Sequence, residues 1–240
     1  MIQQLTSNQK KTARYAGLFY LIFIGLTVIA ELIRSRIIVF GDAVTTAHNI
    51  VANELLFRAG FVTELFSALF FLLAAWALYV TLRSVNRNLA LLFLLLNLAG
   101  VAVESLNMLN QFNALLVLNL ADYLKVFQVN QLQALAMLSL NSYADGFMIA
   151  QIFYATWLLP LGYLVYKSAL IPRILGILLI IDFFGVLIWF LQFFLYPGHD
   201  LITYPGLVVS FFAEFSLSVW LLIKGVNDQK PTDVVTVIAN

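Results

Sequence analysis

Acidic residues inside otherwise apolar stretches are the strongest chemical signal in this sequence. Each of six long apolar segments carries one acid, and none of these segments has a lysine, arginine or histidine well inside. The six acids are Glu31, Glu64, Glu104, Asp145, Asp182 and Glu214. An acidic side chain at the centre of a membrane span costs about 2.5–3.5 kcal/mol on insertion scales, so such residues normally face a bundle interior or a wet cavity. The pattern predicts an acidic pocket within the membrane.

Converging carboxylates without buried bases have three ways to avoid remaining charged and unpaired. They take up protons, bind a cation, or pair with arginines at the helix ends. The arginines in question are Arg34, Arg36 and Arg58. The first two outcomes imply proton exchange or cation binding, whereas the third is structural, because arginines at helix ends often reach back to a neighbouring carboxylate.

The segment 89–118 carries a regular series of polar and small residues. Asn97, Gly100, Glu104, Asn107 and Gln111 recur at steps of three and four, which places them within an arc of about 80° on one helix face. They fit one wall of the predicted pocket. Small and amide residues at this spacing also allow two membrane helices to pack closely and to hydrogen-bond, which is the structural alternative.

Trp189 lies on the same predicted face as Asp182 and either stacks on a ligand or packs in the core. The candidate ligand-binding residues are therefore Glu31, Glu64, Asn97, Glu104, Asn107, Gln111, Asp145, Asp182, Trp189, Glu214, Arg34 and Arg58. No catalytic residue and no cofactor is predicted, because the chain lacks the HExxH and GxSxG motifs and contains no cysteine. His48 and His199 match no metal-ligand spacing, and the sequence assigns no metal.

The elements that position these residues follow from composition. Of 240 residues, 62% are hydrophobic and 10% are charged, and the mean hydropathy is +0.95. Soluble domains are about 45–50% apolar and about 25% charged, so the sequence predicts an all-α polytopic membrane protein. A net charge of +1 without a basic block excludes nucleic acid as a partner. The expected partner is the lipid bilayer.

Apolar runs long enough to cross a bilayer predict six transmembrane helices. They cover 15–33, 57–82, 89–118, 141–166, 174–195 and 204–223. Two short amphipathic helices are expected on the external surface: one after Asp42, with Val44, Ala47 and Val51 on one face, and one capped by Asn130. We predict an N-terminal segment 1–13, a transmembrane domain 14–226 and a mobile tail 227–240.

The distribution of basic residues predicts the orientation. The side that carries both termini collects Lys10, Lys11, Arg14, Arg83, Arg87, Lys167, Arg173, Lys224 and Lys230, against Arg34, Arg36, Arg58 and Lys125 on the other. The positive-inside rule then places both termini in the cytoplasm. Counting along the helices puts the first four acids within roughly 10 Å of the external interface, and Asp182 and Glu214 near the midplane.

Several short motifs extend along the whole chain. They include Arg14–Leu18, Leu56–Gly60, 85–90, Pro172–Gly176 and the run from Ala213 to Val226. With these motifs, residues 12–226 resemble a bacterial integral-membrane family catalogued as a domain of unknown function. The resemblance implies a six-helix protein of the bacterial inner membrane and carries over no activity or catalytic residue.

Three functions fit these patterns. The first is binding or transport of a cation, a proton-linked small solute or a lipid-derived ligand in an outward-facing acidic pocket. The second is an intramembrane enzyme that acts on lipid or peptide through paired carboxylates. The third is a structural or regulatory membrane subunit.

Overall fold

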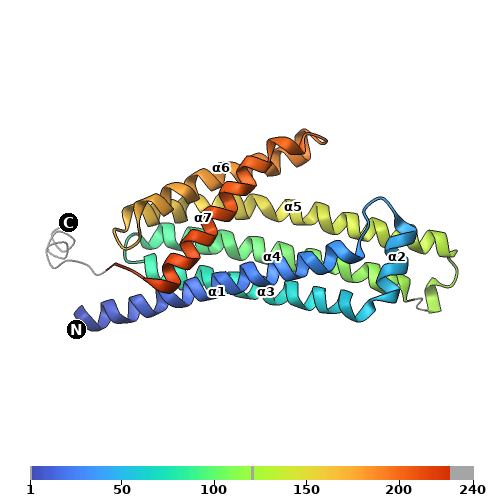
Figure 1. Ribbon diagram of the computed structural model, residues 1–240, viewed down its shortest axis with the longest axis horizontal. Coiled ribbons are helices and arrows are strands. Elements are labelled where there is room, and N and C mark those ends of the chain that lie inside the picture. Colours follow the sequence, from blue (N-terminus) through green and yellow to red (C-terminus); the bar gives the residue numbers. More distant parts are fainter. Residues whose placement is uncertain (1, 120–121, 228–240) are drawn as a thin grey trace. The chain divides into compact units, whose positions relative to one another are not determined.

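A computed structural model describes residues 2–119 and 122–227, and within these ranges the chain is helical without strands. Figure 1 shows the elements. They are α1 (Ile2–Ile37), α2 (Ala43–Ala52), α3 (Glu54–Leu82), α4 (Arg87–Leu118), the 3₁₀ helix η1 (Asp122–Leu124), α5 (Val129–Lys167), α6 (Arg173–Leu195), the 3₁₀ helix η2 (Asp200–Ile202) and α7 (Tyr204–Ile223). Most of the predicted tail, 228–240, lies outside the described residues, as does Lys230.

Six helices are long and apolar enough to cross a membrane, as predicted. They are Asn8–Ile37, Glu54–Leu82, Arg87–Leu118, Val129–Lys167, Arg173–Leu195 and Asp200–Ile223. Backbone polar groups find no water in hydrocarbon, so a chain of this composition satisfies them within helices. The protein is therefore an all-α membrane protein.

Two helices are longer than predicted. α1 begins at Ile2 rather than near residue 15, so the predicted N-terminal segment is part of the helix. The second predicted surface helix is the beginning of α5, which runs without a break from Val129 to Lys167. No glycine or proline stands between Val129 and Asp145 to end a helix there. The amide of Asn130 still accepts a hydrogen bond from the backbone of Gln131.

The first surface helix forms where it was predicted. The carboxylate of Asp42 accepts hydrogen bonds from the backbone N–H of Thr45, at 2.9 Å, and from its hydroxyl, at 2.6 Å. These bonds satisfy donors that the first turn of α2 leaves free. The three predicted apolar residues, Val44, Ala47 and Val51, all line one groove, whereas the buried residues of this helix are Thr46, Ala47 and Ile50.

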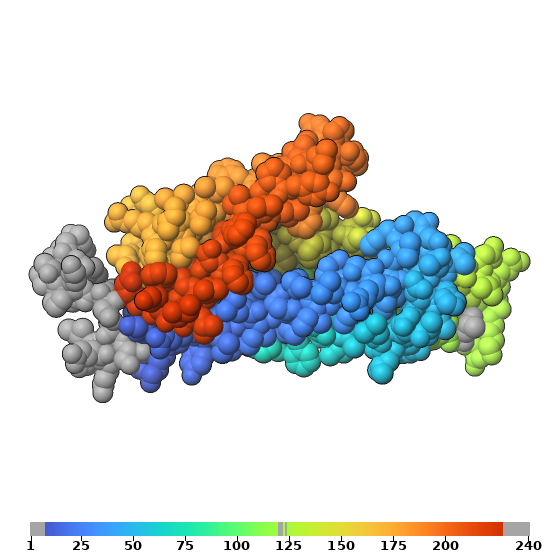
Figure 2. Space-filling model, viewed as in Figure 1, coloured from blue at the N-terminus to red at the C-terminus, as the bar shows by residue number. Residues whose placement is uncertain are grey.

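Val44 and Val51 are exposed instead, and they line a groove of about 420 Å³ with Leu118 and Val129. Figure 2 shows α2 in blue and the start of α5 in yellow-green on this part of the surface.

The chain divides into two compact units, which are described separately. Unit 1 comprises Met1–Leu21, Phe70–Gly100 and Gln151–Asn240, and unit 2 comprises Ile22–Leu69 and Val101–Ala150. Four long helices, α1, α3, α4 and α5, contribute residues to both units. Helices α6 and α7 belong to unit 1 and α2 to unit 2.

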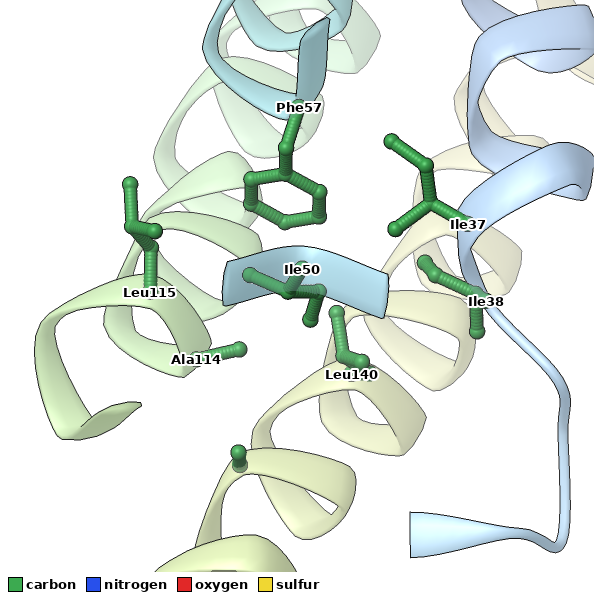
Figure 3. Packing of buried hydrophobic residues seen from close by; sticks show 8 residues of the cluster. Ile37, Ile38, Ile50, Phe57, Ala114, Leu115 and Leu140 are labelled. Carbon is green, nitrogen blue, oxygen red and sulfur yellow. The ribbon is translucent and has the colours of Figure 1, made fainter. Parts of the chain in front are cut away.

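The core of unit 2 forms around α2. Ile50 of α2 meets Ile37 at the end of α1, Ile38 directly after that helix, and Phe57 from the start of α3 (Figure 3). Ala114 and Leu115 of α4 and Ala136 and Leu140 of α5 complete this cluster. Burial of these side chains fixes the short surface helix onto unit 2, because a ten-residue helix is not stable alone.

A cluster of aromatic side chains lies in the core of unit 1. The indole of Trp157 contacts the rings of Tyr20, Phe71 and Phe93, with centroids 5.1–6.3 Å apart. Gly17 allows α1 to approach α7 closely, because a Cβ atom at this position would lie 2.4 Å from the backbone nitrogen of Leu222. Close backbone approach through small residues is typical of membrane helices.

Candidate functional site

The structure brings charged side chains together in unit 2 around Arg34, near the end of α1. Its Nη1 atom lies 3.2 Å from both carboxylate oxygens of Glu64 on α3. Its Nε and Nη2 atoms donate to Glu31 one turn earlier, at 3.0 and 2.5 Å. One guanidinium therefore forms hydrogen bonds with two of the six acids that the sequence singled out.

Tyr143 of α5 completes this arginine cluster, which we define as Arg34, Glu31, Glu64 and Tyr143. The tyrosine hydroxyl donates to Glu64 and also contacts Arg34, whose guanidinium lies 5.0 Å from the centre of the tyrosine ring. Glu104 of α4 is near enough to act electrostatically on the tyrosine hydroxyl. The cluster therefore joins α1, α3 and α5 in unit 2.

An amide network on α4 supports Tyr143 through its backbone. Asn107 donates to the carbonyl of Tyr143 at 2.7 Å, and Asn110 donates to the side-chain oxygen of Asn107 at 3.0 Å. Gly146 provides the room, since a Cβ atom there would lie 2.0 Å from the Oδ1 atom of Asn107. This part of the polar series on 89–118 thus makes contacts between helices.

Exposure separates the two acids of the arginine cluster. The side chain of Glu31 is 59% exposed, whereas those of Arg34 and Glu64 are 16% and 9% exposed. The Arg34–Glu64 pair is therefore the one removed from solvent. A buried pair of this kind needs additional hydrogen bonds to offset its desolvation, and Tyr143 supplies one.

Three predicted site residues of unit 2 lie apart from these bonds. Arg58 pairs with Glu54 one turn earlier on α3, at 2.7 Å between Nη2 and Oε1. Asp145 is exposed. Gln111 is buried, and its Oε1 atom has no hydrogen-bond partner among the described residues.

The last two acids of the series meet in unit 1. Asp182 of α6 and Glu214 of α7 interact electrostatically with each other, and both act on the hydroxyl of Tyr20 from α1. We call Asp182, Glu214 and Tyr20 the carboxyl pair with its tyrosine. Two carboxyl groups and a phenol can hold and exchange protons, because each accepts a hydrogen bond when ionised and donates one when protonated.

Asp182 has the smallest exposed surface of the six acids. Its side chain is 0% exposed. Neither of its oxygens has a partner with hydrogen-bond geometry among the described residues, although the hydroxyl of Ser210 on α7 lies beside it. A buried carboxylate without a partner is costly as an anion, so this position favours a bound proton or cation.

Two glycines bring α6 and α7 together one turn from Asp182. A Cβ atom on Gly185 would lie 2.9 Å from the Cα atom of Gly206, so no larger residue fits between these backbones. The helices can therefore approach closely enough for residues on either side of the contact to interact.

Two further predicted residues lie in unit 1. Asn97 of α4 is 0% exposed, and neither polar atom of its amide has a hydrogen-bond partner among the described residues. Trp189 of α6 is half-buried. The polar series on 89–118 is thus divided, with Asn97 and Gly100 in unit 1 and Glu104, Asn107 and Gln111 in unit 2.

The sequence did not single out Tyr143 and did not assign Tyr20 to the site. Tyr20 stands on the same α1 face as Glu31, so spacing could have identified it. Tyr143 stands near the start of the predicted span 141–166, where tyrosines of membrane proteins are most often interfacial, so its position in the sequence gave no signal for a site. Among the described residues, no group of three or more histidine, cysteine, aspartate or glutamate side chains could hold a metal ion.

Comparison with known proteins adds one assignment. No curated protein and no solved structure matches the chain. Residues 15–225 match the family described as Domain of unknown function (DUF4386), in agreement with the resemblance found along 12–226. Because the match covers most of the 240 residues, the chain belongs to the DUF4386 family.

Proposed function

We propose that this membrane protein binds and exchanges protons at the carboxyl pair of Asp182 and Glu214, and that this exchange is linked to the movement of a cation or small solute. The observation that carries the proposal is the carboxylate of Asp182, which is fully buried and stands beside a second acid. Among the described residues it accepts no hydrogen bond of full geometry, although the hydroxyl of Ser210 lies beside it. Two such groups do not both remain ionised in a low-dielectric environment.

The position of basic residues supports this proposal. In unit 1 the described lysines and arginines occur in the third and fourth turns of α1 or at the ends of the other helices. They are Lys10, Lys11, Arg14, Arg83, Arg87, Lys167, Arg173 and Lys224. Asp182 and Glu214 each stand about nine residues, or roughly 13 Å along the helix axis, from the end of their own helix that carries a basic residue. A proton or an external cation is therefore the available counter-charge.

The acids of unit 2 have a different environment. Glu31 and Glu64 are both bonded to Arg34, so the charge of these two carboxylates is partly offset within the protein. We assign the arginine cluster a structural role in unit 2.

The orientation belongs to the same proposal. The basic residues of unit 1 support cytoplasmic termini under the positive-inside rule, in a bacterial inner membrane. Residues 14–226 then form the transmembrane domain.

An enzyme with paired carboxylates is the second candidate. Asp182 and Glu214 would be its acids, but neither lines the groove at α2 or the groove between α6 and α7. A hydrolase needs a substrate-sized cavity at the reacting groups. Proton exchange at a carboxyl pair needs no such cavity, so we place it first.

The test compares Asp182→Asn and Glu214→Gln with the wild-type protein in liposomes that carry an internal pH-sensitive dye. A pH gradient across the membrane should drive proton flux through the wild-type protein, and either variant should reduce it at least tenfold. Infrared spectra should also lose a protonated carboxyl band in each variant. Both substitutions preserve side-chain size and hydrogen-bonding capacity.

Asp145→Asn is the matched control, because Asp145 is an exposed acid on α5 and should retain wild-type flux. Equal flux in the wild type and in both pair variants, with all proteins folded by circular dichroism, would reject proton exchange at this pair.

A further inference from the structure

An apolar groove of about 490 Å³ lies between the start of α6 and the end of α7 in unit 1. Its apolar walls include Ile174 and Leu175 from α6 and Phe215, Val219 and Trp220 from α7, and Lys224 stands at the end of α7. Figure 2 shows these two segments in gold and in red. The volume lies within the range of about 300–1,000 Å³ that accommodates small ligands.

The surroundings of the groove are basic. Arg14 donates to the carbonyl of Ile223, and Gly225 packs against Lys10, so the first turns of α1 lie beside the end of α7. The backbone N–H of Asn227 donates to the carbonyl of Leu170, which brings in the turn that holds Lys167 and Arg173. No aspartate or glutamate occurs in these described stretches, 8–17, 166–175 and 219–227.

Aromatic residues mark the same region as a membrane interface. Lys167 lies over the ring of Tyr163 at 5.9 Å, and Arg173 lies over the ring of Tyr166 at 5.8 Å. Both tyrosines are exposed. Tyrosine, tryptophan and basic residues concentrate at the level of lipid headgroups, with the hydrocarbon beside them.

We propose that this groove is a binding site for an anionic phospholipid, with one acyl chain between α6 and α7 and the phosphate paired with Lys224. The apolar walls match the acyl chain, and the basic rim matches the negative headgroup. Basic pockets between transmembrane helices bind anionic headgroups for this reason. The site is separate from the carboxyl pair, and the inference does not depend on proton exchange.

The test uses the full-length protein in detergent, titrated with phosphatidylglycerol or with phosphatidylcholine of the same acyl chains. Native mass spectrometry counts bound lipid, and we expect one phosphatidylglycerol bound at least tenfold more tightly than phosphatidylcholine. Lys224→Gln should weaken phosphatidylglycerol binding about fivefold, the effect of one basic residue near a headgroup. Lys11→Gln is the matched control, since Lys11 is exposed and does not line the groove, and it should retain wild-type affinity.

Fluorescence locates the acyl chain. Phosphatidylglycerol with brominated acyl chains should quench wild-type tryptophan emission more than that of Trp220→Phe, which lacks the indole in the groove. Equal affinity for both lipids, equal loss in Lys224→Gln and Lys11→Gln, or quenching unchanged by Trp220→Phe would each overturn the proposal. Dimerisation that Val219→Trp abolishes, without lipid binding, would assign the groove to a second copy of the chain and would also overturn it.

Discussion

The Nη1 atom of Arg34 on α1 lies 3.2 Å from both carboxylate oxygens of Glu64 on α3, and these residues are 30 positions apart in the chain. The same guanidinium holds Glu31 on its own helix. The two acids thus share one base but differ in burial, so they should differ in what they contribute to stability.

Glu64→Gln should lower the free energy of unfolding by about 2 kcal/mol. Removing one member of a buried pair typically costs about 3–5 kcal/mol, and Arg34 keeps Glu31 as a partner, which reduces the loss. Glu31→Gln is the matched comparison and should cost at most about 1 kcal/mol, because exposed pairs contribute little. Unfolding followed by circular dichroism in mixed micelles measures both. A larger loss in Glu31→Gln than in Glu64→Gln would contradict this account.

Gly146→Ala should destabilise unit 2 by about 1–3 kcal/mol, the usual effect of overpacking a well-packed contact. The added methyl group would occupy the place of Asn107 Oδ1 and displace the amide that holds the carbonyl of Tyr143. The double variant Gly146→Ala with Asn107→Ala should lose less stability than the sum of the two single variants.

Gly25→Ala is the control for this measurement. An added Cβ atom at Gly25 meets nothing within 4 Å, and alanine is the better helix former by about 1 kcal/mol. Additive losses at Gly146 and Asn107 would show that the two positions are not coupled.

Gly185→Ala should separate α6 from α7. The new Cβ atom would meet backbone atoms of Gly206 at 2.9–3.2 Å, and backbone cannot rotate away as a side chain can. We expect a loss of about 1–3 kcal/mol and reduced proton flux, since Asp182 and Glu214 would move apart. Ile181→Leu, at an exposed position of α6, should change neither the stability nor the proton flux. Wild-type flux in Gly185→Ala would show that the close approach does not serve the carboxyl pair.

Asp42 should give α2 a pH-dependent cap. Hydrogen bonds from the hydroxyl and backbone N–H of Thr45 hold the pKa of Asp42 below its ordinary value of 3.8. A carboxylate whose pKa is lower in the folded state contributes its full stabilisation above the unfolded value. This contribution is lost as the pH falls through the folded value, so the cap should remain until the pH is below 3.8.

The chemical shift of the Thr45 amide, followed by NMR during acid titration, measures the midpoint. Asp42→Asn retains a capping oxygen and should abolish the titration, whereas Asp42→Ala should also increase amide exchange at Thr45. A midpoint at or above 3.8 would contradict the predicted direction.

Helix formation depends on local interactions, and here the sequence was informative. Hydropathy predicted the six spans, with α6 and α7 correct to within one residue, and Asp42 predicted the start of α2. The beginning of α1 and the continuity of α5 were missed. Polar residues in both stretches resembled surface segments, yet neither stretch contains a residue that ends a helix.

The sequence by itself determined a six-helix membrane protein with one acid in each predicted span. The number of helices follows because each apolar segment is long enough to cross the hydrocarbon layer once. Only the tertiary structure decided which acid received Arg34 and which stayed without a base. Each acid stands alone in an otherwise apolar span, so the sequence of one helix does not indicate which acid an arginine on another helix will meet. The rotation of each helix about its axis and its packing against neighbouring helices determine which side chains meet. In unit 2 they bring Glu64 to Tyr143 and Arg34, and in unit 1 they bring Asp182 to Glu214.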